Sequence, residues 1–194
     1  MIDVARPARR CLLFTGHRVD VPGRQTPRFP AAAETLARKM IVEAVEFERS
    51  RYPGLDLCGI ASGANGGDIL FLEVCAEAGI PTEMYLAMDA EQFIEASVAD
   101  GGHQWVERFH KLVSELPVHI LQEDANSELN VWQRTNLWML DTALSVSGHS
   151  TTVIALWDGG AADGAGGTKD MARRARNSGA HFVLLDASLL TDTA

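Results

Sequence analysis

The chain has 194 residues, of which 46% are hydrophobic and 22% are charged. This length suits one well-buried domain and is short for two, so we treat residues 1–194 as a single domain with a loose polar lead-in at 1–9. The formal net charge of −9 disfavours a general nucleic-acid binder, which normally carries a basic stripe. It does not exclude an anionic small ligand.

Three cysteines, Cys11, Cys58 and Cys75, each stand alone among apolar residues. This pattern predicts buried free thiols in a reducing compartment, and neither a disulfide framework nor a zinc site. The sequence shows no signal peptide and no apolar stretch of membrane-spanning length. We therefore expect a cytoplasmic protein with no membrane partner, no bound metal and no cofactor.

Apolar runs alternate with segments of helical pattern along the chain. The runs predict strands at 10–15, 55–61, 80–87, 118–121, 151–157 and 181–185. Helices are predicted at 31–51, 69–79, 89–98, 103–116, 131–144 and 169–178, the first with Leu36, Met40, Ala44 and Phe47 on one stripe. This alternation indicates an α/β fold with a doubly wound, mostly parallel, Rossmann-like sheet and helices on both faces.

The first of three unusual loops follows the strand at 10–15. It begins with Gly16, His17 and Arg18 and continues with Arg24 and Arg28 among prolines. Long irregular connections in compact domains are usually either functional or disordered. The loop is therefore either a flap that closes over an anion or a solvated connection. We favour His17 as a ligand contact because it ends the strand at the predicted crevice.

The second loop is a glycine-rich turn between the strand at 55–61 and the next helix. Its residues have little or no side chain, so an oxyanion can approach the main chain and the positive end of the helix dipole. Asp68 stands where it can cap the helix. The alternative is a tight connection that binds nothing. The turn consists of Ser62, Gly63, Ala64, Asn65, Gly66, Gly67 and Asp68.

The third loop ends in Gly166, Gly167 and Thr168 and follows Trp157, a candidate stacking partner for a base. In a parallel sheet all three loops lie at the carboxyl edge, where ligands of doubly wound sheets bind. The sequence therefore predicts a phosphate or nucleotide site at that edge.

The helix predicted at 131–144 is apolar on most faces, so its polar residues Gln133, Arg134 and Asn136 stand out. They form either a ligand-facing patch or the one wet side of the helix. The small number of polar residues in this helix favours the patch.

Together these motifs resemble the SLOG superfamily, a Rossmann-like group that includes the Smf/DprA DNA-processing proteins and the LOG phosphoribohydrolases. The turn from Ser62 to Asp68 resembles the Ser-Gly-x-Ala-x-Gly-x-Asp turn of the Smf side. Gly166-Gly167-Thr168 resembles the LOG turn that cradles a nucleotide phosphate. The segment from Gly16 to Pro30 is similar to SLOG-like modules of bacterial signalling and defence proteins. The resemblance extends from Cys11 to Asp186.

The resemblance implies a nucleotide-derived ligand, such as a cyclic or NAD-derived nucleotide. LOG enzymes carry a catalytic glutamate in the pattern Gly-Thr-x-x-Glu, and Met171 stands at that position here. The neighbouring Asp170 is turned by about 100° around a helix. Arg134 is a loose counterpart of the LOG arginine. The resemblance therefore implies binding without turnover.

Three hypotheses stay open. The leading one is a sensor or binding module for a nucleotide derivative in bacterial signalling or antiviral defence. The alternative is an N-glycosidase acting on nucleoside monophosphates through Asp170 or another acid, with Arg134 as a further candidate residue. The third is Smf-like binding of single-stranded DNA, which the acidic charge disfavours. The sequence leaves open whether the chain forms a homo-oligomer and whether an effector is fused to it or partners with it.

Overall fold

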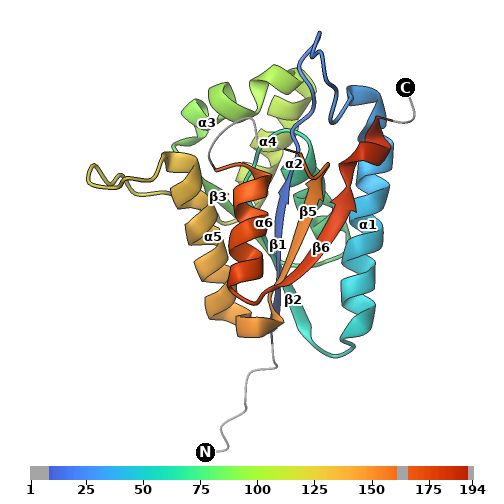
Figure 1. Cartoon of the computed structure of the whole chain (residues 1–194), viewed down its shortest axis with the longest axis vertical. Helices are drawn as coiled ribbons and strands as arrows, with labels where there is room; N and C mark the ends of the chain where they lie inside the picture. The colour runs from blue at the N-terminus through green and yellow to red at the C-terminus, as the bar shows by residue number, and fades with distance from the viewer. Residues whose placement is uncertain (1–8, 161–165, 192–194) are drawn as a thin grey trace, which may run out of the picture.

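A parallel sheet organises the computed structural model, which describes residues 9–160 and 166–191. Its strand order is β4-β3-β2-β1-β5-β6, and every neighbouring pair runs parallel (Figure 1). This arrangement confirms the predicted doubly wound α/β fold. The strands are β1 (Arg9–Gly16), β2 (Asp56–Ala61), β3 (Thr82–Leu86), β4 (Val118–Ile120), β5 (Thr152–Trp157) and β6 (His181–Asp186).

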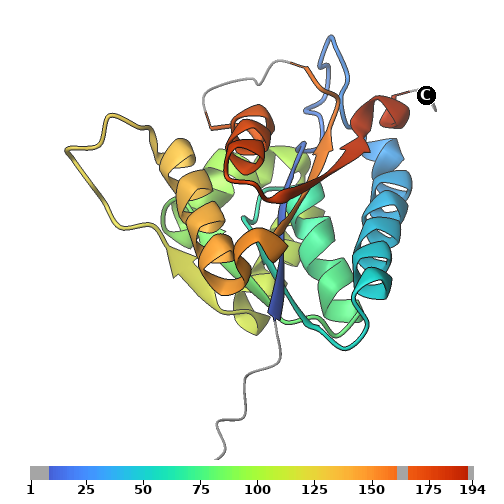
Figure 2. The ribbon, with the colours of Figure 1, turned by 60° about the horizontal axis from the view of Figure 1, so that its bottom comes forward.

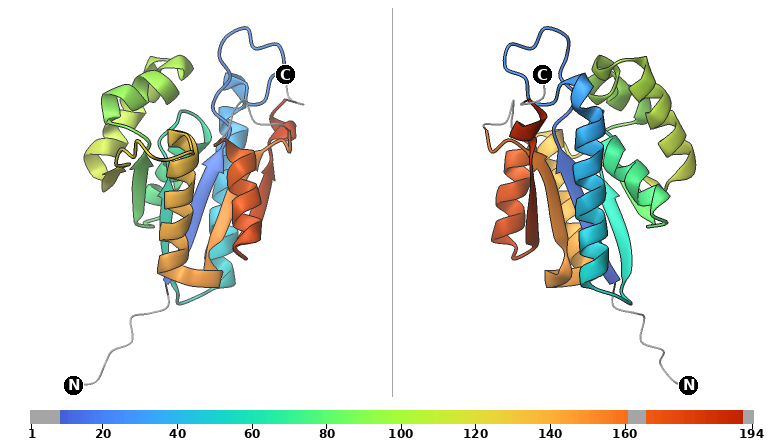
Figure 3. Two further views of the ribbon diagram at one scale, coloured as in Figure 1. Left: turned by 60° about the vertical axis from the view of Figure 1, so that its left-hand side comes forward. Right: turned by 90° about the vertical axis from the view of Figure 1, so that its right-hand side faces the viewer.

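Helices cover both faces of the sheet (Figure 3). On one face lie α1 (Glu34–Arg51) and α2 (Gly67–Glu77), with α4 (His103–Glu115) beside α2. On the other face lie α5 (Val131–Ser147) and α6 (Thr168–Asn177). The remaining helical pieces are α3 (Ala90–Ser97) and the short η1 (Ala31–Ala33), η2 (Ala99–Gly101), η3 (Gly148–Ser150) and η4 (Ala187–Leu190). Within the described residues, every helix falls short of the length and apolarity needed to cross a membrane.

The central strand β1 is buried on both sides, which explains its unbroken apolar run. Cys11, Leu12, Leu13 and Phe14 have no exposed surface. Leu13 pairs with Ile60 of β2 on one side and with Val153 of β5 on the other. The two helical layers therefore enclose a core on each face of this strand.

The cysteines are free, as predicted. Cys11 and Cys75 are buried, whereas Cys58 is only partly covered. The prediction of a buried thiol is therefore wrong for Cys58, because it lies near the start of β2, where the helices cover the sheet less completely.

Helix α1 packs through a stripe that differs in part from the one expected. Ala37, Ile41, Ala44, Val45 and Glu48 are buried, and Leu36 and Met40 pack against the core from the side, whereas Phe47 is 57% exposed. The expected stripe is therefore correct except for Phe47, and the centre of the buried stripe lies one residue further along the helix. This rotation brings Glu48 to a cation in β1, and that contact was not visible in the apolar pattern.

Glu48 and Arg10 form a buried ion pair between α1 and β1. Arg10 Nη2 lies 3.0 Å from Glu48 Oε2, and their side chains are 5% and 0% exposed. The hydroxyl of Thr152 accepts a hydrogen bond from Arg10 and donates one to Glu48, at 2.7 and 2.9 Å. Helix α1, the central strand and β5 are thus joined by an almost fully buried ion pair and a hydroxyl group.

We predict that Glu48→Ala lowers the free energy of unfolding by about 3–5 kcal/mol, because it leaves Arg10 buried without its counter-charge. Urea denaturation measures this effect. The matched control is Glu46→Ala on the same helix, whose exposed pair with Arg49 is worth less than about 1 kcal/mol. Equal losses for the two variants would contradict an anchoring role for the buried pair.

The topology creates a crevice at the carboxyl edge of the sheet. From β1 the chain continues to β2 on one side, while β5 and β6 extend the sheet on the other side. The loops after β1 and β5 therefore leave at the switch point, where doubly wound sheets bind ligands. Figure 2 shows the segment after β1, in blue, standing over the ends of the strands.

Candidate functional site

A pocket of about 370 Å³ lies at this switch point. The segment after β1, the end of α3, the start of α5, the end of β5 and the start of α6 all line it. We call it the outer pocket. The predicted site residues that line it are Gly16, His17, Arg18, Arg24, Arg28, Trp157, Gly166, Gly167 and Thr168.

A smaller cavity of about 150 Å³ adjoins the outer pocket, and we call it the inner chamber. The two share a rim that includes Arg18, Trp132 and the turn Gly166–Thr168. The second predicted loop reaches the site here. The predicted residues that line the chamber beyond the shared ones are Ser62, Ala64, Asp68 and Asn136.

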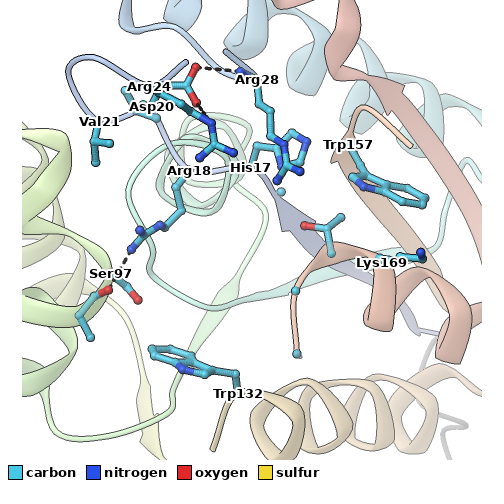
Figure 4. Close-up of a pocket in the computed structure, with 16 residues that line it drawn as sticks. His17, Arg18, Asp20, Val21, Arg24, Arg28, Ser97, Trp132, Trp157 and Lys169 are labelled. Atoms are coloured by element: carbon cyan, nitrogen blue, oxygen red, sulfur yellow. Dashed lines mark hydrogen bonds and ion pairs between the residues drawn. The ribbon is translucent and has the colours of Figure 1, made fainter. Parts of the chain in front are cut away.

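Arg18 connects the segment after β1 to the end of α3. Its guanidinium donates a hydrogen bond to the carbonyl oxygen of Ala96 at 2.9 Å and pairs with Asp100 at 2.8 Å. These contacts hold its charge at the rim shared by the two cavities (Figure 4).

Arg24 and Arg28 line the outer pocket from the same segment and are also held by carboxylates. Arg24 Nε lies 3.3 Å from Asp20 Oδ1, and Arg28 Nε lies 3.3 Å from Asp158 Oδ2. Asp20 Oδ2 also accepts the main-chain N–H groups of Arg28 and Phe29, which closes the base of the loop. That this segment closes over an anion, rather than being a solvated connection, stays a prediction.

His17 has a carboxylate partner that the sequence did not reveal. Its Nε2 lies 3.2 Å from Asp158 Oδ1 and 3.3 Å from the main-chain nitrogen of Asp158. Partial burial opposes the charged form of Asp158, but the N–H of Gly160 and the charges of His17 and Arg28 outweigh it and lower its pKa. Asp158 therefore stays ionised and ties the loops after β1 and β5 together.

The turn before α6 presents a helix N-terminus to both cavities. Gly166 has φ of 94°, and an added Cβ would lie 2.7 Å from the Cβ of Trp132. Its carbonyl oxygen accepts a hydrogen bond from Asn136 Nδ2 at 2.6 Å. Gly167 caps α6 without a side-chain hydrogen bond. Because the first N–H groups of a helix lack an acceptor within the helix, Thr168 and Lys169 can offer donors to a ligand.

The first glycine turn uses its main chain differently. The N–H of Gly67 donates to the carbonyl oxygen of His17 at 3.1 Å, and that of Asn65 donates to Ser97 at 2.9 Å. A Cβ on Gly66 would lie 2.8 Å from the main-chain nitrogen of Val19. These glycines therefore allow the chain to pack against itself. Gly63, Asn65, Gly66 and Gly67 line neither cavity.

Asp68 does not cap α2, because Gly66 occupies the N-cap position and Asp68 lies in the first turn. Its side chain faces the inner chamber and is 7% exposed. Burial raises its pKa to about 7, although main-chain groups of Ala64 and Gly16 and the charge of Arg18 oppose the shift. A buried acid whose pKa is this high, in a cavity, is typical of functional sites.

Two positions considered for catalysis, Asp170 and Met171, lie outside both cavities. Asp170 pairs along α6 with Arg173 and Arg174, at 2.6 and 2.8 Å. Met171 is fully buried against β1 beside Cys11 and Leu13. Asp170 therefore lies on the flank of α6, and Met171 lies on the side of the helix that faces the core.

Arg134 does not join the cavities either. Its guanidinium donates a hydrogen bond to the carbonyl oxygen of Gln122, and Gln133 caps the start of α5 together with Asn130. Of the three polar residues noted in this helix, only Asn136 lines a cavity. The expected ligand-facing patch is thus reduced to one residue that positions the second glycine turn.

Several pocket residues were missed by the sequence analysis. Trp132 lines both cavities from the start of α5, and Ser97 does the same from the end of α3. Lys169 follows Thr168 directly, so its position after the second turn was the available signal. Asp20 and Asp158 carried no signal, because an ion-pair partner cannot be read from a single sequence.

The fold and the pocket define a Rossmann-like α/β protein with a cleft at its switch point that is lined by three arginines and a lysine. Compared with known proteins, the chain matches no family model and no curated sequence at a significant level. In the described part of the chain, no group of three His, Cys, Asp or Glu residues is arranged to hold a metal ion.

We predict that Asp68→Asn stabilises the protein above neutral pH. The raised pKa means that, between about pH 4 and 7, the folded protein holds a proton that the unfolded chain has released. Stability therefore falls as pH rises through this window, by at most about 4 kcal/mol, and the variant escapes this loss. Urea unfolding of both proteins at pH 4 and pH 8 measures the difference. The raised pKa of Asp68 would be contradicted if the two proteins were equally stable at pH 8, or if their stabilities differed more at pH 4 than at pH 8.

Proposed function

We propose that the protein binds a phosphate-bearing, nucleotide-derived ligand at the switch-point pocket and does not turn it over. One observation carries this proposal: the N-terminus of α6 and the side chains of Arg18, Arg24, Arg28 and Lys169 line the same pocket. Free N–H groups and the helix dipole favour an anion, and guanidinium groups add donors whose geometry suits phosphate.

Two tryptophans support a nucleotide rather than a simple anion. Trp132 and Trp157 line the outer pocket from α5 and β5, on different sides of its opening (Figure 4). Indole rings offer flat apolar surface for stacking a base, while the cations hold the phosphate. An aromatic surface next to an anion site is the combination that a nucleotide requires.

Binding without turnover is supported by the position of the carboxylates. The position that would carry the LOG glutamate is Met171, which is buried in the core, and Asp170 is engaged with two arginines. N-glycosidase activity is the second candidate, because Asp68 is a buried acid in the inner chamber with a pKa suited to general acid catalysis. Assaying nucleoside monophosphates for released base distinguishes the two.

The proposed biological role rests on the resemblance to SLOG sensors. It is recognition of a cyclic or NAD-derived nucleotide in bacterial signalling or antiviral defence. A cytoplasmic location fits three cysteines that are free. Coupling to an effector or to a second copy of the chain belongs to the same proposal.

We predict that Lys169→Ala weakens nucleotide binding by about 1.5–3 kcal/mol, the scale for losing a hydrogen bond to a charged group. Calorimetric titration with nucleoside monophosphates, cyclic nucleotides, NAD and ADP-ribose first identifies a ligand and then compares the variants. Arg24→Ala and Arg28→Ala should show losses of the same order.

Lys111→Ala on α4 is the matched control, since Lys111 is an exposed lysine that lines neither cavity. Its affinity should equal that of the parent protein. Unchanged affinity in all three pocket variants would place the anion site elsewhere. Release of free base by the parent protein, abolished by Asp68→Asn, would replace the sensor with the glycosidase.

A further inference from the structure

We propose that the inner chamber receives the pentose of the ligand and that Asp68 binds its vicinal hydroxyl groups, so that the site selects ribonucleotides over deoxyribonucleotides. This inference rests on the proposed function, because the phosphate has to occupy the adjacent helix N-terminus. It adds the class of sugar to that proposal.

The shared rim sets which part of the ligand enters the chamber. The turn Gly166–Thr168 lines both cavities, so a phosphate bound there lies between them. In a nucleotide the pentose is attached directly to the phosphate. A phosphate at this rim therefore has the chamber on one side and the outer pocket, with Arg24 and Arg28, on the other.

The lining of the chamber suits a small hydroxylated ring. Its volume of about 150 Å³ is less than half that of the outer pocket. Its lining combines hydroxyl and carboxyl groups with aromatic side chains, those of Phe14, Phe93 and Trp132. The polar side chains that line it are Thr15, Arg18, Ser62, Asp68, Ser97, Thr135, Asn136 and Thr168.

Three of these eight polar side chains have hydrogen-bond or ion-pair partners within the protein. Asn136 donates to Gly166, Thr135 donates to Val131, and Arg18 pairs with Asp100. Asp68 is the carboxylate in this lining: no cation forms an ion pair with it in the described part of the chain, and Arg18 acts on it only through its charge. A carboxylate offers about four acceptor positions, and two main-chain groups leave room for more.

A pair of vicinal hydroxyls is the ligand group that matches this acceptor. Above its pKa of about 7, Asp68 is ionised, and the two oxygens of a carboxylate can accept hydrogen bonds from two neighbouring hydroxyls at once. A purine or pyrimidine is bonded to the pentose and not to the phosphate, so the stacking surface within its reach is Trp132, which lines both cavities. The sugar is thereby assigned to the chamber and the base to the rim at Trp132.

The test compares matched pairs of probes. The four ribonucleoside 5′-monophosphates, their 2′-deoxy analogues, ribose 5-phosphate and inorganic phosphate are titrated into the parent protein, Asp68→Asn and Asp68→Ala. We expect the best ribonucleotide to bind the parent about 10- to 100-fold more tightly than its deoxy analogue. In Asp68→Ala this ratio should fall to about one, and in Asp68→Asn it should fall below the parent value.

Inorganic phosphate should bind the three proteins equally, because Asp68 does not contribute to the helix N-terminus. Asp141→Asn, which removes an exposed carboxylate of α5, should keep the parent ratio. Ribose 5-phosphate that binds as tightly as the nucleotides would identify a sugar phosphate as the ligand and still support the chamber assignment.

Equal affinity of the parent for ribo and deoxy probes would overturn the inference while leaving the proposed function standing, as would a ratio unchanged in both Asp68 variants. Asp68→Asn is nearly isosteric with the parent residue, so it provides this result even where Asp68→Ala does not fold. Failure of every phosphate compound to bind the parent would overturn the proposed function and this inference together.

Discussion

The site depends on one buried side-chain amide, that of Asn65. Its Oδ1 accepts the N–H of Val19 at 3.0 Å, and its Nδ2 donates to the carbonyl of Val98 and to Asp100, at 3.1 and 2.6 Å. One residue thereby joins the turn after β2 to the segment after β1 and to the end of α3. Because Asn65 is fully buried, losing any of these partners would leave a polar group without compensation. The positions of Arg18 and of the rim around it follow from this amide.

The two glycine turns show how far local sequence can be interpreted. Both were expected to cradle a phosphate, and both lie at the carboxyl edge as the alternation of strands and helices predicted. Their main chains nevertheless have different partners: Gly67 donates to His17, whereas α6 begins at the pocket. Absence of a side chain permits a close approach, but it does not say whether a ligand or the chain itself approaches. Only the three-dimensional packing distinguishes these cases.

Features that depend on helix rotation or on distant partners were beyond the sequence. The apolar pattern located α1 correctly but gave a stripe that includes Phe47, since the buried Glu48 looked like a surface residue until its pairing with Arg10 was seen. Arg134 and Trp132 lie two residues apart in α5, yet only Trp132 faces the cavities. Periodicity fixes the relative directions of neighbouring residues, and packing decides which direction is inward.

The pairing of the pocket arginines with Asp20, Asp100 and Asp158 has a consequence for selectivity. Positive charge in the cleft is largely compensated by the protein, so an arriving anion competes with carboxylates that already occupy the guanidinium groups. A chloride ion has one charge and no directional acceptors, so its contacts with the guanidinium groups are weaker than the carboxylate contacts that it would have to displace. A ligand that carries several phosphate oxygens on a rigid frame can replace many of these contacts together. For the ligand proposed above, the aspartates thus favour an anion with several phosphate oxygens over a monovalent ion such as chloride.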